Sequence, residues 1–213
     1  MKHPSLRDQA YDIIKHKLLH QEIAPGERIR EDILAEEISM SRTPVREAVN
    51  QLTAEGFISY VPRKGLFAIE LSRKELEDLL DVRLSLELLS VDRCINIIDD
   101  HEQQLGKVKK TLEEWELAIK NKRYDECNSY DSEFHLGLAY ITQNIKLITF
   151  LKDIESFMQI ARVTEKKHFT EEMYESSLKE HKEICAAIER KDKETAFNAL
   201  RENIRNMKKN IRI

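Results

Sequence analysis

The stretch from residue 73 to residue 213 contains no proline, and this constrains the fold more than any other feature. Its only glycines are Gly106 and Gly137, so the usual turn signals between β-strands are missing. Apolar residues recur through it with a helical period. We therefore predict a mainly α protein whose larger part is an antiparallel all-α helical bundle. Its helices are expected at residues 73–98, 101–121, 124–141, 145–166, 171–190 and 192–210.

The preceding residues follow another pattern, in which two short helices come close together. Residues 31–39 form the first, and only residues 40–42 separate it from the second. Thr43 followed by Pro44 predicts the start of the second helix, because a hydroxyl can cap it and proline suits its first position. Gly56 predicts its end. This tight connection indicates a helix-turn-helix. The second helix is expected to bury Val45, Ala48, Val49 and Leu52.

A hairpin follows this pair of helices. Residues 57–61 and 66–70 are short β-branched or aromatic runs, and residues 62–65 between them have the composition of a turn. A further helix, ended by a turn at residues 24–26, precedes the pair. Its apolar stripe is Leu6, Ala10, Ile13, Ile14 and Leu18. We predict a winged helix-turn-helix domain over residues 1–71 and the all-α domain over residues 72–213.

The polar side of the second helix suits DNA. A recognition helix enters the major groove with its N-terminus first, which would place Ser41, Arg42, Thr43 and Arg46 nearest the DNA. Hydroxyls and helix N-terminal N–H groups suit phosphate oxygens, and an arginine fork matches guanine. The alternative is that Arg42 and Arg46 are ordinary surface charges on a small domain.

Residues 25–29, 34–36, 41–48, 55–56 and 62–65 together resemble the DNA-binding domain of the GntR family of bacterial transcription regulators. The resemblance implies base and phosphate contacts by Ser41, Arg42, Thr43 and Arg46. It also implies that a wing around Lys64 and Gly65 reaches the minor groove. The chain departs from the family at Asp32, where an arginine is common, so one usual DNA contact is missing or replaced.

Bulk charge does not indicate DNA binding here. The formal net charge is −4, and residues 1–72 hold ten Lys or Arg against eleven Asp or Glu. We therefore expect binding through a few placed contacts, strongly weakened by salt.

No apolar run approaches the roughly 20 residues needed to span a bilayer, and residues 1–9 lack the apolar core of a secretory signal. We expect a cytoplasmic protein with no membrane contact. Cys94, Cys127 and Cys185 are widely spaced, odd in number and without a CxxC pair, which argues against a disulfide framework or a thiolate zinc site, and we expect them to be buried.

Several bundle helices place polar groups on their apolar faces. Asp131 and His135 lie one turn apart, and His181 and Asn203 face inward from two later helices. Because burying them without partners is costly, we expect them to meet as a mixed nitrogen and oxygen site for a divalent metal. The alternative is two satisfied core histidines and a surface aspartate.

The layout of Asp131, Phe134, His135, Glu180 and His181 is similar to the FCD effector domain of FadR-like GntR regulators. Many such domains hold a metal with one aspartate and three histidines. The resemblance therefore implies a divalent metal, zinc first and manganese or nickel as alternatives. The last histidine position is Asn203 here, a weaker ligand.

Arg83 and Glu87 lie on the apolar stripe of the first bundle helix. They form either an i,i+4 ion pair or, as the resemblance suggests, an effector site in which Arg83 binds a carboxylate beside the metal. Arg162 flanks a later apolar stripe in the same way and is a second effector candidate. Trp115 is expected in the core or an interface.

The resulting hypothesis is a transcription regulator, with repression as its expected action. It would bind a palindromic operator in double-stranded DNA as a homodimer, controlled by a small carboxylic or sugar acid. Two alternatives remain. One is a metal-dependent enzyme with an N-terminal targeting module, and the other is a DNA-binding dimer with no effector.

Overall fold

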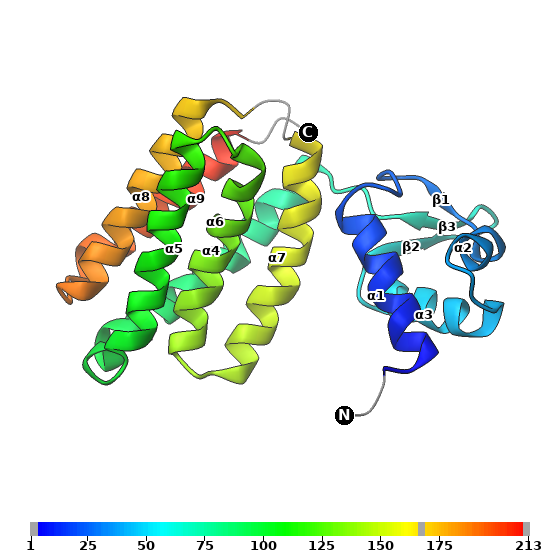
Figure 1. Ribbon diagram of the computed structural model, residues 1–213, viewed down its shortest axis with the longest axis horizontal. Coiled ribbons are helices and arrows are strands. Elements are labelled where there is room, and N and C mark those ends of the chain that lie inside the picture. Colours follow the sequence, from blue (N-terminus) through cyan, green and yellow to red (C-terminus); the bar gives the residue numbers. More distant parts are fainter. Residues whose placement is uncertain (1–3, 166–168, 211–213) are drawn as a thin grey trace. The chain divides into compact units, whose positions relative to one another are not determined.

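The computed structural model describes residues 4–165 and 169–210. The chain divides into two compact units, residues 1–72 with 159–163, and residues 73–158 with 164–213 (Figure 1). In the parts described, no helix is both long enough and apolar enough to span a bilayer.

The first unit is a winged helix-turn-helix. Its elements are α1 (Leu6–Leu19), β1 (Arg28–Ile29), α2 (Glu31–Glu37), α3 (Arg42–Ala54), β2 (Ile58–Val61) and β3 (Gly65–Ala68). The strands are antiparallel in the order β1-β3-β2. Val45, Ala48, Val49 and Leu52 of α3 are fully buried, as are Ala10 and Ile14 of α1, which packs against it. The predicted inward face of the second helix and the predicted hairpin are thus confirmed.

Two local predictions in this unit were wrong, and one strand was missed. Helix α3 begins at Arg42, with Ser41 as its N-cap, and not at Pro44. Proline is tolerated throughout a first helical turn, because the N–H groups of that turn have no partner within the helix. Pro44 therefore indicated the first turn of the helix but not its first residue. Helix α1 ends at Leu19 and not at residues 24–26, since Gln21 adopts a left-handed φ of 55°. Strand β1 was not predicted at all.

The second unit contains the predicted helices, apart from residues 159–163 near the end of the fourth one, which are grouped with the first unit. They are α4 (Arg73–Ile97), the 3-10 turn η1 (Ile98–Asp100), α5 (Glu102–Lys120), α6 (Tyr124–Ile141), α7 (Ile145–Glu165), α8 (Glu171–Glu189) and α9 (Lys193–Asn210). The helix expected over residues 145–166 has its last residue outside the described residues. Helix α5 packs against α6 and α8, and α4 packs against α6, α8 and α9. The inward faces of these helices therefore share one core.

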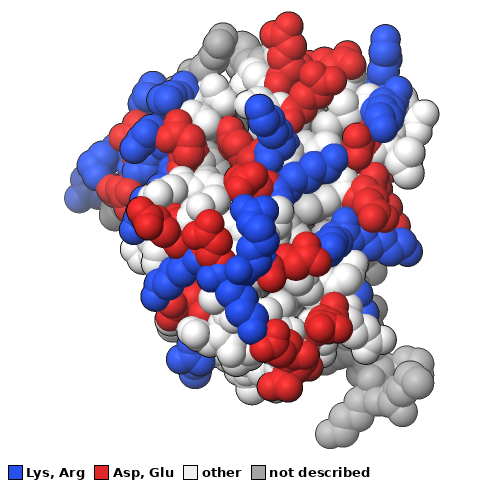
Figure 2. Space-filling model, turned by 90° about the vertical axis from the view of Figure 1, so that its left-hand side faces the viewer, with Lys and Arg blue, Asp and Glu red and all other residues white. Residues whose placement is uncertain are grey.

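Short left-handed turns reverse the chain between bundle helices. Lys122, Gln143 and Lys191 have φ between 53° and 58°, and each lies two residues after the last residue of α5, α6 or α8. The bundle face seen in Figure 2 carries interspersed basic and acidic side chains, as expected of a solvated surface. The three cysteines are buried and unpaired, as predicted.

Candidate functional site

The N-terminal turn of α3 presents its polar side outward. Ser41, Arg42 and Thr43 are exposed, and so is Arg46 one turn later. The Ser41 side chain makes no capping hydrogen bond within the helix. This turn therefore offers hydroxyls, guanidinium groups and helix N–H groups at one exposed edge, as the sequence predicted.

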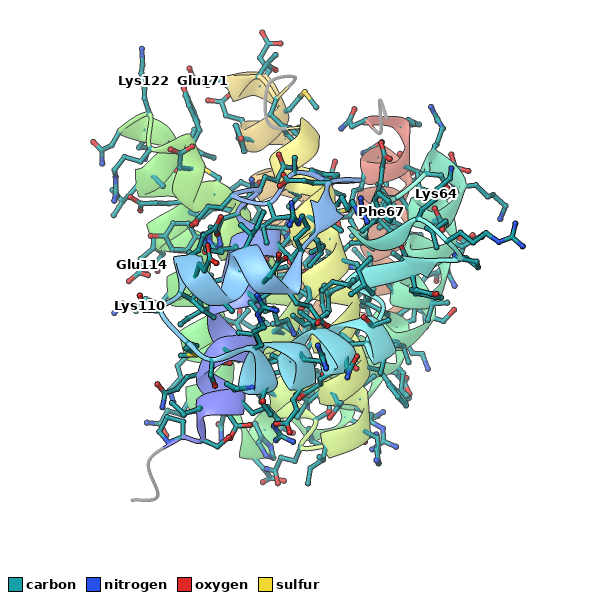
Figure 3. The ribbon with its side chains drawn as sticks, turned by 90° about the vertical axis from the view of Figure 1, so that its right-hand side faces the viewer. Lys64, Phe67, Lys110, Glu114, Lys122 and Glu171 are labelled. Atoms are coloured by element: carbon teal, nitrogen blue, oxygen red, sulfur yellow. The ribbon has the colours of Figure 1, made fainter. Side chains whose placement is uncertain are left out.

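The hairpin tip is also exposed. Lys64 lies in the turn, where its N–H donates to the carbonyl of Val61 at 3.0 Å (Figure 3). Gly65 has a φ of 110°, which favours glycine, and it begins β3. The wing therefore carries a cation next to a residue without a side chain.

In the bundle, Asp131 and His135 of α6 meet His181 of α8. His181 Nε2 lies 2.9 Å from His135 Nε2 and 3.2 Å from Asp131 Oδ1. All three residues are buried, and their potential ligand atoms lie within 4.8 Å of one another. The structure thus brings together three of the four predicted metal ligands, and Asp131 is not a surface carboxylate.

The outer nitrogens of both imidazoles face oxygen atoms. His181 Nδ1 lies 2.6 Å from the carbonyl oxygen of Ser177, and His135 Nδ1 lies 2.9 Å from Glu87 Oε2. These oxygens favour a proton on each Nδ1, so that each Nε2 would offer a lone pair to a ligand. Two lone pairs 2.9 Å apart repel each other, and a cation bound by both Nε2 atoms would remove this repulsion. The donor set therefore fits a divalent metal.

Glu87 connects this cluster to Arg83. Arg83 Nε donates to Glu87 Oε1 at 2.6 Å, and Arg83 Nη2 lies 3.8 Å from Asp131 Oδ2. The Arg83 and Glu87 side chains are only 2% and 4% exposed. The pair predicted from i,i+4 spacing is therefore a buried ion pair and not a weak surface one.

The pKa values in this network keep both partners charged. Burial opposes ionisation of Glu87, but Arg83 and His135 outweigh it and lower its pKa to about 2. Burial likewise opposes the charge on Arg83, but the carboxylates of Glu87, Glu155 and Asp131 raise its pKa. Burial lowers the pKa of His135, which favours the neutral imidazole that a metal requires.

Asn203 of α9 has one amide atom engaged and one without a partner. Its Nδ2 donates to Glu180 Oε2 at 2.9 Å, and Asn206 Nδ2 donates to Glu180 Oε1 at 2.8 Å. Asn203 Oδ1 is buried and makes no hydrogen bond with the described residues. A buried amide oxygen without a donor is costly, and a cation would satisfy it.

Of the remaining candidates, Trp115 is buried with its ring centroid 4.8 Å from that of His181. It is a core residue, as expected. Arg162 is buried in α7, and its assignment as an effector residue stays a prediction.

Sequence reasoning missed two carboxylates. Glu87 was noted only as a neighbour of Arg83, yet it faces His135 from another helix. Glu180 was noted only in the motif before His181, yet it binds the amides of Asn203 and Asn206. The inward position of Glu87 on its helical stripe was the available signal.

Two family matches cover most of the chain. Residues 6–67 match the bacterial regulatory proteins of the gntR family, and residues 78–206 match the FCD domain. The fold resembles that of E. coli McbR/YncC, with a TM-score of 0.80 at 23% identity over 96% of each chain.

Proteins with similar sequences agree with these family matches. An uncharacterized HTH-type transcriptional regulator of Bacillus subtilis, YdhC, is 31% identical over 189 residues, or 88% of this chain and 83% of the relative. The gluconate operon transcriptional repressor of B. subtilis is 30% identical over 204 residues, or 91% of this chain and 79% of the relative. These proteins are transcription regulators and not enzymes. The chain therefore belongs to the GntR family of bacterial transcription regulators, with a winged helix-turn-helix DNA-binding domain and an FCD effector-binding domain.

Proposed function

We propose that the protein binds a palindromic operator as a homodimer and represses transcription, and that a small carboxylic or sugar acid in the bundle controls its affinity for DNA. A relative named as an operon repressor supports the sign of regulation. Two-fold symmetry would match two recognition helices to half-sites about one helical turn apart, roughly 34 Å. Acting on the bacterial chromosome, the protein would work in the cytoplasm.

The bundle has an apolar surface suited to a second copy. Val82 and Leu89 of α4 are 53% and 40% exposed. Leu86 lies between them in sequence and packs against the buried cluster of Ala139, Leu147 and Leu151. Exposed apolar side chains beside a core contact favour burial against a partner, and an isologous contact would bury this face on both copies.

The polar network from Arg83 through Glu87 to His135 carries the proposal for effector control. A carboxylate that binds Arg83 must compete with Glu87, whose second oxygen faces His135. Effector binding would therefore change the surroundings of a proposed metal ligand. A difference in effector affinity between two arrangements of the bundle is what could alter DNA affinity.

Asp131, His135 and His181 would hold the metal, with Asn203 Oδ1 as the fourth ligand atom. Two imidazoles favour zinc, while two oxygens also suit manganese, and nickel is a further candidate. A divalent cation there would add positive charge beside Arg83 and so attract an acidic effector. Glu180 would keep the Asn203 amide turned so that its oxygen, and not its nitrogen, is available.

Operator selection tests the DNA part of this proposal. We expect the purified protein to enrich a short palindrome from a random duplex pool, because two symmetry-related α3 helices read equal half-sites. The selection is repeated after treatment with chelator, and a weaker affinity would tie the bundle to DNA binding. Failure to enrich any sequence at low salt would contradict the proposed operator.

Effector control is tested on the selected duplex with a panel of small carboxylic and sugar acids. Release of DNA by one acid in the wild type, but not in Arg83→Lys, would support the proposed site. Lysine keeps the charge but not the fork that grips a carboxylate. If no acid changes DNA affinity, the proposed control by a small carboxylic or sugar acid is contradicted.

Metal affinity should depend on Glu180. Chelator-treated protein is titrated with Zn²⁺ or Co²⁺, and the absorption bands of Co²⁺ report its ligands. We expect Glu180→Ala to weaken binding about 10–100-fold, as is usual for residues that orient ligands, and Asn203→His to strengthen it. Asn206→Ala, which removes the other amide on Glu180, is the matched control and should change affinity little. Equal Co²⁺ spectra for Asn203→His and the wild type would contradict a ligand role for Asn203.

A further inference from the structure

A basic hollow lies in the first unit, between β1, the wing and the N-terminal ends of α2 and α3. Its volume is about 450 Å³, and its lining includes Arg28, Arg30, Arg42 and Arg46. Arg42 and Arg46 were predicted to contact DNA. Arg28 is the first residue of β1, and Arg30 directly follows this strand. Because the strand was not predicted, neither arginine was predicted to contact DNA.

Strand β1 places Arg28 beside the wing. Arg28 pairs with Phe67 of β3, and the pairing of Ile29 with Leu66 fixes the register. A Cβ atom at Gly65 would lie 3.5 Å from Nε and Nη2 of Arg28, so the guanidinium lies against the glycine at the start of β3. Arg28 is exposed. A cation therefore lies at the base of the wing, next to the residue expected to reach the minor groove.

Two acidic residues also line the hollow, and each is paired with an arginine. Arg30 Nη2 donates to Asp32 Oδ2 at 2.9 Å, and Arg46 Nε donates to Glu31 Oε2 at 3.1 Å. Both arginine side chains are more than half exposed. The pairs hold each guanidinium at the surface and leave its other N–H groups available to a phosphate, since guanidinium has five donors.

We propose that Arg28 and Arg30 bind the DNA backbone between the groove entered by α3 and the groove reached by the wing. Asp32, which accepts a hydrogen bond from Arg30 Nη2, orients the Arg30 guanidinium. This inference rests on the DNA-binding function. It adds a row of backbone contacts that links the recognition helix to the wing, and such contacts set affinity and register without reading sequence.

The test measures binding of the full-length protein to a fluorescein-labelled duplex of random sequence and to the duplex enriched by selection. We expect Arg28→Ala and Arg30→Ala each to weaken binding to both duplexes by about tenfold at low salt. The slope of log affinity against log salt should fall by about 0.9 for each lost phosphate contact. Asp32→Asn should strengthen binding, because it removes a negative charge near phosphate.

Arg7→Ala is the matched control, because Arg7 is an exposed arginine of the same unit that is paired with its neighbour Asp8 at 2.8 Å. It should leave both affinity and slope unchanged. The double variant Arg30→Ala/Asp32→Asn distinguishes two roles of Arg30. Arg30 could contact a phosphate directly, or it could only neutralise the charge of Asp32. If it binds DNA with the affinity and slope of Asp32→Asn alone, Arg30 makes no contact and the proposal is overturned. Loss of binding in Arg42→Ala but not in these variants would remove the proposal and leave the DNA-binding function intact.

Discussion

Replacing Glu87 with alanine is expected to lower the free energy of unfolding by about 3–5 kcal/mol, because it leaves a buried arginine without its closest counter-charge. Arg83 is almost wholly buried, and its Nε donates to Glu87 at 2.6 Å. Asp131 lies 3.8 Å from Arg83 Nη2 and would compensate only part of the loss. Urea unfolding followed by circular dichroism, with chelator present so that metal binding does not contribute, measures the change.

The double variant Arg83→Met/Glu87→Leu is the control for this prediction. Removing both charges avoids an uncompensated ion, and apolar side chains of similar size fill the space. Its stability should lie within about 1–2 kcal/mol of the wild type, since such replacements of buried pairs are often neutral or stabilising. A loss below about 1 kcal/mol in Glu87→Ala itself would mean that Arg83 finds another partner, and the network as described would be wrong.

Replacing Arg42 with alanine is expected to abolish most sequence-specific DNA binding. Arg42 is the first residue of α3 and is exposed, so its loss should not affect folding. A bidentate arginine contact to guanine discriminates by about 1–3 kcal/mol, and a homodimer would lose two such contacts. The expected loss is therefore roughly 30-fold to 10⁴-fold on the selected duplex, measured by fluorescence anisotropy at fixed salt.

Arg42→Lys shows which kind of contact is lost. Lysine retains attraction to phosphate but not the planar fork, so binding to random duplexes should persist while preference for the selected duplex falls. Equal losses on both duplexes in Arg42→Lys would place Arg42 on the backbone and not on a base. Unchanged binding of Arg42→Ala to the selected duplex would remove Arg42 from the interface.

The sequence predicted an element correctly wherever the pattern of apolar residues within that one element was enough to define it. The helical spacing of apolar residues from residue 73 onward predicted each bundle helix. A helix that packs on one side needs apolar residues at that spacing in its own sequence. Strand β1 has only Arg28 and Ile29, too short for any alternation, and it exists because β3 offers a free edge. Such a strand is determined by its partner and not by its own residues.

The sequence predicted which residues form the proposed buried metal site, but it did not predict the hydrogen bonds and ion pairs that link them to neighbouring helices. Spacing placed Asp131, His135 and His181 on inward faces, and the structure brings them together. It could not indicate that Glu87 would face His135 or that Glu180 would bind Asn203, because these contacts depend on how neighbouring helices are rotated about their axes. Side-chain pattern fixes which face is inward but not which residues of two faces meet.

The sharing of Glu87 between Arg83 and His135 restricts how such a regulator could acquire a new ligand during evolution. A single substitution at Arg83 that suits an uncharged ligand would leave the buried Glu87 carboxylate beside His135 without its arginine partner. A single substitution at Glu87 would leave the buried Arg83 guanidinium without its closest carboxylate. Either intermediate would have a weakened fold before gaining a new response. A lineage is therefore expected to keep Arg83 and Glu87 together or to exchange both. Divergence in ligand preference would then accumulate at residues around the network that carry no charge in it.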